Sequence, residues 1–190
     1  RHKDQNETVI FDVFYRNNPL DSGYAISAGL EQVINYIKNL HFSKQDIDYL
    51  KSLHMFDDDF LDYLETFEFT GDIYAIPEGT VIFPREPLIK VIAPIMEAQL
   101  VETAILTILN HQCLIATKAS RVCYAAKGDS ILEFGLRRAQ GPDAGIYGAR
   151  AAVIGGCKGT SNVLAGQLFN IPVMDTHAHS WVMSFPDEYT

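Results

Sequence analysis

Side chains able to hold an anion gather between residues 131 and 180. Arg137 and Arg138 are adjacent, and each guanidinium offers a fork of donors that fits a carboxylate or a phosphate. The run Gly-Thr-Ser-Asn at 159–162 precedes an apolar segment, which predicts a capped helix start. The free amides of such a first turn also suit an anion, although capping alone explains the run. We therefore expect the arginines, above all, to contact a ligand.

A His-x-His pair follows at His177 and His179. In an extended strand both imidazoles would point to one side, which suits a metal ion. The sequence Asp175-Thr-His177-Ala-His179 resembles the D-x-H-x-H motif of zinc-dependent amidohydrolases. Those enzymes carry the motif on the first strand of a barrel, whereas two strand-helix patterns precede it here. A histidine that acts as a nucleophile or as a hydrogen-bonding partner is the other interpretation.

Three short apolar runs, separated by helical segments, must position these residues. This alternation is typical of a parallel sheet or barrel, whose ligands lie beyond the carboxyl ends of the strands. The arginines follow the first strand, Ser161 follows the second and Thr176 follows the third, so we expect one shared rim. The predicted elements are a strand at 130–134, a helix at 143–154, a strand that starts at 155–157, a helix at 161–169 and a strand at 171–175.

The pattern of residues 1–128 predicts an α+β domain. We expect the boundary to a second domain, residues 129–190, at Gly128-Asp129. Ser43 and Asp46 match the capping box of a helix. The fold class is therefore α/β, with an N-terminal α+β domain followed by the first strand-helix units of an irregular, TIM-like α/β barrel, incomplete in this chain. The predicted N-terminal elements are a strand at 8–15, helices at 28–40, 43–54 and from 57, a small β unit at about 67–93 and a long linking helix at about 95–126.

The composition limits the class of partner. With 47% hydrophobic and 21% charged residues, the 190-residue chain is typical of a soluble globular protein. A net charge of −9 argues against a nucleic-acid partner. The most apolar region, residues 100–116, is interrupted by Glu102, Asn110, His111 and Gln112, so we expect no membrane span. Small molecules or proteins are the expected partners.

Three cysteines, Cys113, Cys123 and Cys157, lie far apart in the sequence. Their odd number and the lack of a C-x-x-C pair argue against a structural zinc site or a disulfide framework. We expect buried thiols in a reducing cytoplasm. No apolar signal core follows the charged start of the chain.

Longer blocks of the sequence resemble the nicotinate phosphoribosyltransferase family. They are EFGLRRAQGPDAG at 133–145, IGGCKGTSNVLAG at 154–166 and IPVMDTHAHS at 171–180, with further similarity at 94–103 and 23–30. The resemblance implies the type II phosphoribosyltransferase fold. It also implies that nicotinate is joined to phosphoribosyl pyrophosphate, giving nicotinate mononucleotide and pyrophosphate in NAD salvage. ATP hydrolysis would be coupled to this reaction through a phosphohistidine.

The same resemblance implies roles for individual residues. His179 would be the histidine that ATP phosphorylates, Thr176 would line the nicotinate pocket, and Phe134 would stack on the pyridine ring. Arg137 and Arg138 match arginines that face the phosphates and the substrate. Departing pyrophosphate leaves positive charge on the ribose and carries negative charge away, so cations should act on the leaving group. Mg²⁺ is the expected cofactor and ATP the co-substrate.

Ser161 bears on the choice of substrate. Related nicotinamide-using enzymes resemble this Gly-Thr-x turn but carry Asp at x, where a carboxylate accepts from an amide nitrogen and repels a carboxylate substrate. Serine at this position favours nicotinate. The expected partners are therefore nicotinate, phosphoribosyl pyrophosphate and ATP, and the shared active sites of the family imply a homodimer.

Three features depart from the family's pattern. Asp175 replaces the usual glycine before the T-x-x-H-S motif, where its carboxylate could bind Mg²⁺, orient a histidine or oppose phosphate. The N-terminal T-D-L-Y-Q block is absent. A complete barrel takes about 250 residues, so we expect a fragment of a longer enzyme that is inactive alone. A zinc-dependent amidohydrolase and an inactive scaffold or fragment remain the alternatives.

Overall fold

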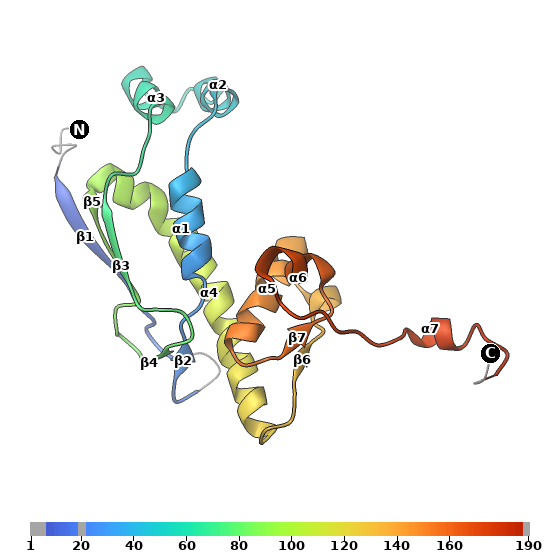
Figure 1. Ribbon diagram of the computed structural model, residues 1–190. Coiled ribbons are helices and arrows are strands. Elements are labelled where there is room, and N and C mark those ends of the chain that lie inside the picture. Colours follow the sequence, from blue (N-terminus) through green and yellow to red (C-terminus); the bar gives the residue numbers. More distant parts are fainter. Residues whose placement is uncertain (1–6, 19–21, 188–190) are drawn as a thin grey trace. The chain divides into compact units, whose positions relative to one another are not determined.

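The computed structural model describes residues 7–18 and 22–187 (Figure 1). The chain divides into two compact units between Cys113 and Leu114. This division falls inside a helix, whereas the sequence placed the domain boundary at Gly128-Asp129. The first part of this helix contributes residues to the core of the first unit, and its last part contributes to the core of the second unit. The helix is continuous where the units divide.

Three antiparallel strands form the main sheet of the first unit, in the order β1-β5-β3. The central strand is β5, and its alternate residues Ile89, Val91 and Ala93 are buried, as the two-residue period of a strand requires. A second antiparallel pair joins β2 to β4. The bounds are β1 Thr8–Val13, β2 Ala25–Ile26, β3 Asp72–Ala75, β4 Val81–Ile82 and β5 Ile89–Pro94.

The predicted small β unit at 67–93 does not stand alone. Its strand β5 pairs along its whole length with β1, with Thr8 opposite Pro94, and its strand β4 pairs with β2. Local alternation identifies a strand but not its partner, because pairing depends on which apolar faces are buried together. The strands at 8–15 and within 67–93 were therefore predicted, whereas β2 and the association of the strands were not.

Helix α1 (Leu30–Asn39) and the first part of α4 (Ile95–Ala125) pack against this sheet, as Figure 1 shows. Val33 and Ile37 of α1 share one hydrophobic cluster with Ile105 of α4 and with the buried residues of β5. The helical spacing predicted for α1 and the helix predicted at about 95–126 are both confirmed. The expected linking helix at 95–126 is a single helix of 31 residues.

Helix α4 is also long and apolar enough to cross a membrane, by length and composition only. The polar residues at 102 and 110–112 do not exclude this, contrary to the expectation from the sequence. Val101, Ile105 and Leu109 are nevertheless buried among residues of the first unit. A core helix of a soluble protein passes the same test, so the absence of a membrane span stays a prediction.

A helical hairpin follows α1. Helices α2 (Lys44–Ser52) and α3 (Asp58–Glu65) contact each other. The predicted capping box is confirmed, because the Ser43 amide donates to Asp46 Oδ2 at 2.8 Å and the Asp46 amide donates to Ser43 Oγ at 3.3 Å. The hydrogen bonds from the Ser43 side chain and backbone hold the pKa of Asp46 below its usual value.

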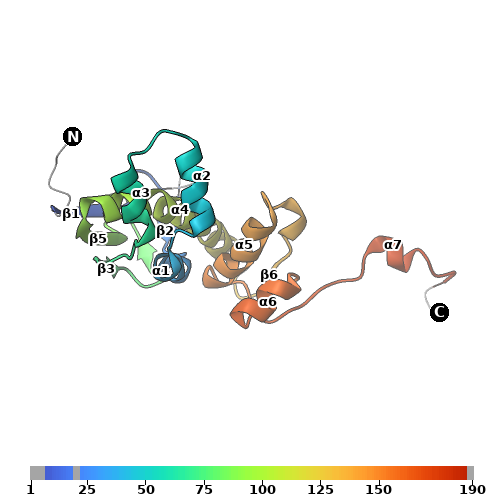
Figure 2. The ribbon, with the colours of Figure 1, turned by 90° about the horizontal axis from the view of Figure 1, so that it is seen from above.

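The second unit has the predicted β-α-β order. Strands β6 and β7 are parallel, with α5 beside β6 and α6 beside β7 (Figure 1), and Figure 2 shows α5 and α6 close to β6. A 3-10 turn, η2, and a short helix, α7, complete the described elements. The bounds are β6 Leu132–Glu133, η2 Leu136–Arg138, α5 Pro142–Ile154, β7 Gly159–Thr160, α6 Val163–Phe169 and α7 His179–Val182.

All three predicted strands of this unit are shorter than expected, and the first, predicted at 130–134, covers only Leu132–Glu133. The second begins at Gly159 and not at Gly155, because Gly155 and Gly156 form the turn that ends α5. Gly156 adopts φ +114° there, a conformation that favours glycine. The third strand is reduced to one parallel bridge between Thr160 and Val173.

The His-x-His segment is not part of a strand. Helix α7 begins at His179, with Ala178 as its N-cap residue. Every residue from Pro172 to Asp187 is exposed. The condition under which both imidazoles would point to one side, an extended strand through His177 and His179, is therefore not met, since the described strand pairing of this segment ends at Val173.

Candidate functional site

The carboxylate of Glu133 joins the ends of β6 and β7. One oxygen accepts a hydrogen bond from the Thr160 hydroxyl at 2.7 Å, and the other accepts one from the Gly135 amide. The Ser161 amide donates to the Glu133 carbonyl at 3.1 Å. A Cβ on residue 135 would lie 2.7 Å from the same carboxylate, so a larger residue there would require the Glu133 side chain to shift. We call these contacts the Glu133 clamp.

The turn η2 carries both predicted arginines. It is closed by a hydrogen bond from the Arg138 amide to the Gly135 carbonyl at 2.9 Å. On its other side Leu136 meets α5 at Gly145, where a Cβ would lie only 2.5 Å from Leu136 Cδ1. Arg137 lines the cavity described below, whereas Arg138 is not among its lining residues.

The end of β7 leads directly into α6. Thr160 is fully buried, and its hydroxyl accepts a hydrogen bond from the Asn162 amide at 3.0 Å. The side chain of Asn162 then caps α6, because its Oδ1 accepts from the Ala165 amide at 3.1 Å. The predicted cap is thus confirmed and falls on Asn162. Ser161 is left half-buried, with its hydroxyl free of the capping role.

The third segment reaches the site through the single bridge to β7. The Met174 amide donates to the Thr160 carbonyl at 3.0 Å. Directly after it, the Thr176 amide donates to its neighbour Asp175 at Oδ1, at 2.7 Å. The backbone is therefore tied to the end of β7 at Met174, while the histidines that follow are exposed.

These three chain segments surround one cavity of about 640 Å³. Of the six residues predicted for the site, five line it, and Arg138 is the exception. The expected rim is thus present in this unit, although its members come from strand ends and turns. The lining residues are Phe134, Leu136, Arg137, Ser161, Asp175, Thr176, His177, Ala178, His179 and Ser180.

The cavity combines an aromatic face with hydrogen-bonding groups and charge. Phe134 is 40% exposed, so its ring can stack on a planar ligand. The guanidinium of Arg137 suits a carboxylate or a phosphate, and the hydroxyls of Ser161 and Thr176 can donate or accept. Asp175 is the carboxylate among the lining residues. A planar anion that carries an aromatic ring fits this set of groups.

The zinc interpretation of Asp175, His177 and His179 gains no support. The two histidines are not held on one side of a strand, which was its geometric basis. Within residues 7–18 and 22–187, no three side chains of His, Cys, Asp or Glu gather in a way that could hold a metal ion.

Sequence reasoning missed Glu133 and Thr160 as residues that shape the site. Both precede predicted residues by one position, at the carboxyl ends of adjacent parallel strands. An acidic side chain that ends one strand and a hydroxyl that ends the next could have been paired from the predicted topology. The hydrogen bond between them spans 27 positions of the sequence, so no local pattern indicates it.

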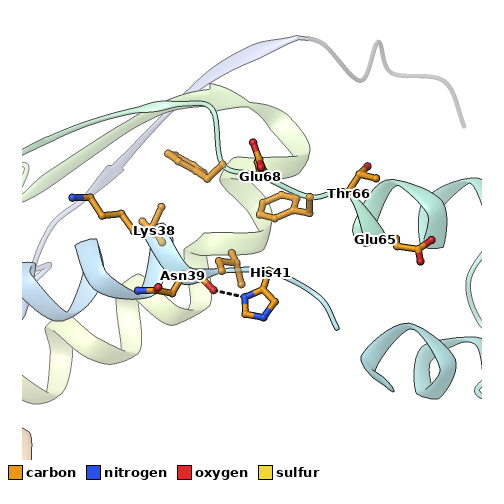
Figure 3. A pocket seen from close by; sticks show the side chains of 10 residues that line it. Lys38, Asn39, His41, Glu65, Thr66 and Glu68 are labelled. Atoms are coloured by element: carbon orange, nitrogen blue, oxygen red, sulfur yellow. Dashed lines mark hydrogen bonds between the residues drawn. The ribbon is translucent and has the colours of Figure 1, made fainter. Parts of the chain in front are cut away.

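A second cavity, of about 800 Å³, lies in the first unit, near the ends of α1 and α3 (Figure 3). Its walls carry charges of both signs, with Lys38 opposed by Glu65 and Glu68. The ring nitrogen Nδ1 of His41 is hydrogen-bonded to the Asn39 carbonyl at 2.7 Å. No residue predicted for the site lies in this cavity, so the cavity of the second unit is the candidate site.

Comparison with known proteins gives a consistent match. The sequence profile of the nicotinate phosphoribosyltransferase (NAPRTase) N-terminal domain matches residues 1–110. A nicotinate phosphoribosyltransferase of Bacillus subtilis is 50% identical over 182 residues, which are 96% of this chain and 37% of the relative. The chain therefore spans little more than a third of that relative's length.

Solved structures agree. The crystal structure of human nicotinic acid phosphoribosyltransferase matches with a TM-score of 0.88 and 36% identity, over 95% of this chain and 37% of that one. A nicotinate-nucleotide pyrophosphorylase from Pyrococcus furiosus matches with a TM-score of 0.77 and 26% identity, over 96% and 39%. These relatives and structures give no support to the amidohydrolase alternative. On the match to its N-terminal domain, the chain belongs to the nicotinate phosphoribosyltransferase family.

Proposed function

We propose that the protein carrying this chain joins nicotinate to 5-phosphoribosyl 1-pyrophosphate, forming nicotinate mononucleotide and pyrophosphate in NAD biosynthesis. The observation that carries the proposal is the gathering of Phe134, Arg137, Ser161, Thr176 and His179 around one cavity. The names of the relatives support it. The chain spans about 37% of their length, so the activity is proposed for the full-length protein.

The roles follow from the chemistry of the two substrates. The pyridine ring of nicotinate stacks on Phe134, and Ser161 and Thr176 face its edge. The pyridine nitrogen forms a bond to C1 of the ribose while the bond from C1 to pyrophosphate breaks. Arg137 bears positive charge beside these anions. Arg138, on the same turn but outside the cavity wall, contacts a phosphate only where that group extends beyond the cavity.

Magnesium fits this site through Asp175. Mg²⁺ typically takes one or two protein carboxylates, with water and substrate phosphates completing its coordination. Asp175 supplies such a carboxylate on the cavity wall, with one oxygen already accepting from the Thr176 amide. When bound, Mg²⁺ neutralises charge on the leaving pyrophosphate. The chain's own residues hold and orient the organic substrates.

ATP is the proposed co-substrate, and His179 is the proposed phosphate acceptor. Its imidazole is exposed and lines the cavity, as an acceptor must. A bond would form between a ring nitrogen and the γ-phosphorus while the bond to ADP breaks. The phosphorylated histidine would add negative charge beside Arg137.

We further propose a cytoplasmic homodimer whose active sites are shared between subunits.

Labelling tests the role of His179. The full-length protein is incubated with ATP labelled at the γ-phosphate, and the label is mapped to a peptide under conditions that preserve phosphohistidine. We expect the label on His179, its loss in His179→Asn and its retention in the matched control His177→Asn, which alters the other imidazole of the cavity. Label on another residue, or label that survives in His179→Asn, contradicts the assignment.

A further inference from the structure

Two thiols of the second unit lie together, although 34 positions separate Cys123 from Cys157. Cys157 is 7% exposed and belongs to a buried cluster with Ala119 and Ala152. Cys123 is partly buried and packs against that cluster from the last turns of α4. Both cysteines are free thiols, and Cys123 is less buried than the sequence suggested.

Two glycines bring the thiols together. A Cβ on Gly155 would lie 2.4 Å from the Ala116 carbonyl oxygen, and a Cβ on Gly156 would lie 3.4 Å from both Cβ and Sγ of Cys123. The turn after α5 therefore runs directly along α4 because it has no side chains to hold it away. The next residue of that turn is Cys157, and Cys123 packs against the buried cluster that contains it.

The two sulfurs differ in environment. Burial, with the neighbouring Cys123 as a lesser cause, raises the pKa of Cys157 to about 12. Cys157 therefore stays protonated at neutral pH and does not react first, because the thiolate is the nucleophile. Cys123 has the more accessible sulfur and is the one that a dissolved reagent meets.

We propose that Cys123 and Cys157 form a dithiol site that takes a low-molecular-weight disulfide, such as glutathione disulfide, and is oxidised to an intramolecular disulfide. The Cys123 thiolate attacks one sulfur of the reagent, which gives a mixed disulfide and releases one thiolate. Cys157 then loses its proton and attacks the Cys123 sulfur, releasing the second. In sum, the protein loses two electrons and two protons, and the reagent is reduced to two thiols.

Such a bond would tie the end of α4 to the entry of β7. Cys157 lies three positions before Thr160, which the Glu133 clamp holds, and four before Ser161, which lines the candidate cavity. Oxidation would thus fix the approach to one side of the site. The inference rests on the packing of the second unit and does not depend on the transferase activity.

Peptide mapping tests the proposal on the natively folded, full-length protein. The protein is treated with glutathione disulfide at pH 8, remaining thiols are blocked by alkylation under denaturing conditions, and the fragments are identified by mass. We expect one cross-linked pair of peptides, containing Cys123 and Cys157 and lighter by two hydrogen atoms. Cys113, fully buried in the first unit, should be alkylated and serves as the internal control.

Single variants identify the order of the steps. Cys157→Ala should stop at glutathione bound to Cys123, whereas Cys123→Ala should leave Cys157 unreacted. Cys113→Ala should form the cross-link as the parent protein does. The proposal is overturned if Cys157 is recovered alkylated after oxidation of the parent protein, if glutathione remains on Cys123 there, or if the cross-link involves Cys113.

Discussion

Substrate choice is argued from one side chain, Ser161. It lines the candidate cavity and is half-buried at the end of β7. Its own backbone is fixed by the hydrogen bond to Glu133, and the neighbouring Asn162 takes over the capping of α6. The side chain of residue 161 is therefore free to face a substrate, and a charge placed there would attract or repel charged groups of a ligand in the cavity.

Replacement of Ser161 by aspartate should reverse or weaken the preference for nicotinate. The added carboxylate repels the carboxylate of nicotinate and accepts from the amide of nicotinamide. We expect the ratio of kcat/KM for nicotinate over nicotinamide to fall by about tenfold or more. Ser161→Ala adds no charge and should keep the original preference. An aspartate variant with an unchanged ratio contradicts the role given to this position.

Glu133 acts through the residues that it holds. Both of its carboxylate oxygens accept hydrogen bonds, and an amide offers only one acceptor oxygen, so Glu133→Gln must lose one of them. The turn η2, which carries Arg137, would be held less firmly. KM for phosphoribosyl pyrophosphate should then rise about three- to tenfold, with a smaller change in kcat. The exposed Glu102→Gln is the matched control. If KM for phosphoribosyl pyrophosphate is the same in both variants, the Glu133 clamp does not position the substrate-binding residues.

At the scale of helices and strands, the sequence predicted those features that depend on residues close together in the chain. The capping box at Ser43 and the alternation in β5 are satisfied within a few residues, and both were predicted correctly. The partners of β5 and the contact between Glu133 and Thr160 join distant positions, and they were not predicted. The apolar pattern at 171–175 predicts a full strand, but a strand also needs a neighbour, and only Val173 has one.

The close packing of α4 on the turn after α5 depends on Gly155. Its φ is negative, so alanine would be tolerated by the backbone itself. A methyl group would nevertheless lie 2.4 Å from a backbone carbonyl and 2.8 Å from the side chain of Ala119. Gly155→Ala should therefore lower the free energy of unfolding by about 1–3 kcal/mol. Denaturant titration measures this.

Gly23→Ala provides the matched control for that change. Nothing lies within 4 Å of a Cβ at Gly23, so its unfolding midpoint should stay close to that of the parent protein. If Gly155→Ala is as stable as Gly23→Ala, the second unit does not pack as described.

At the scale of the whole molecule, the site could be predicted further than the fold that holds it. Three strand ends were expected to share one rim, and five of the six predicted side chains line one cavity. The sixth, Arg138, was predicted for the site but is not among the residues that line the cavity. The chain divides into its two units within α4, where the sequence has no turn or linker that would predict a boundary.

The most direct measurement is of product formed by the full-length protein from nicotinate and phosphoribosyl pyrophosphate, with ATP and Mg²⁺ present. We expect nicotinate mononucleotide and pyrophosphate in equal amounts, a lower yield when ATP is omitted, and much less product with nicotinamide. Folded full-length protein that forms no nicotinate mononucleotide, or that prefers nicotinamide, contradicts the proposed function.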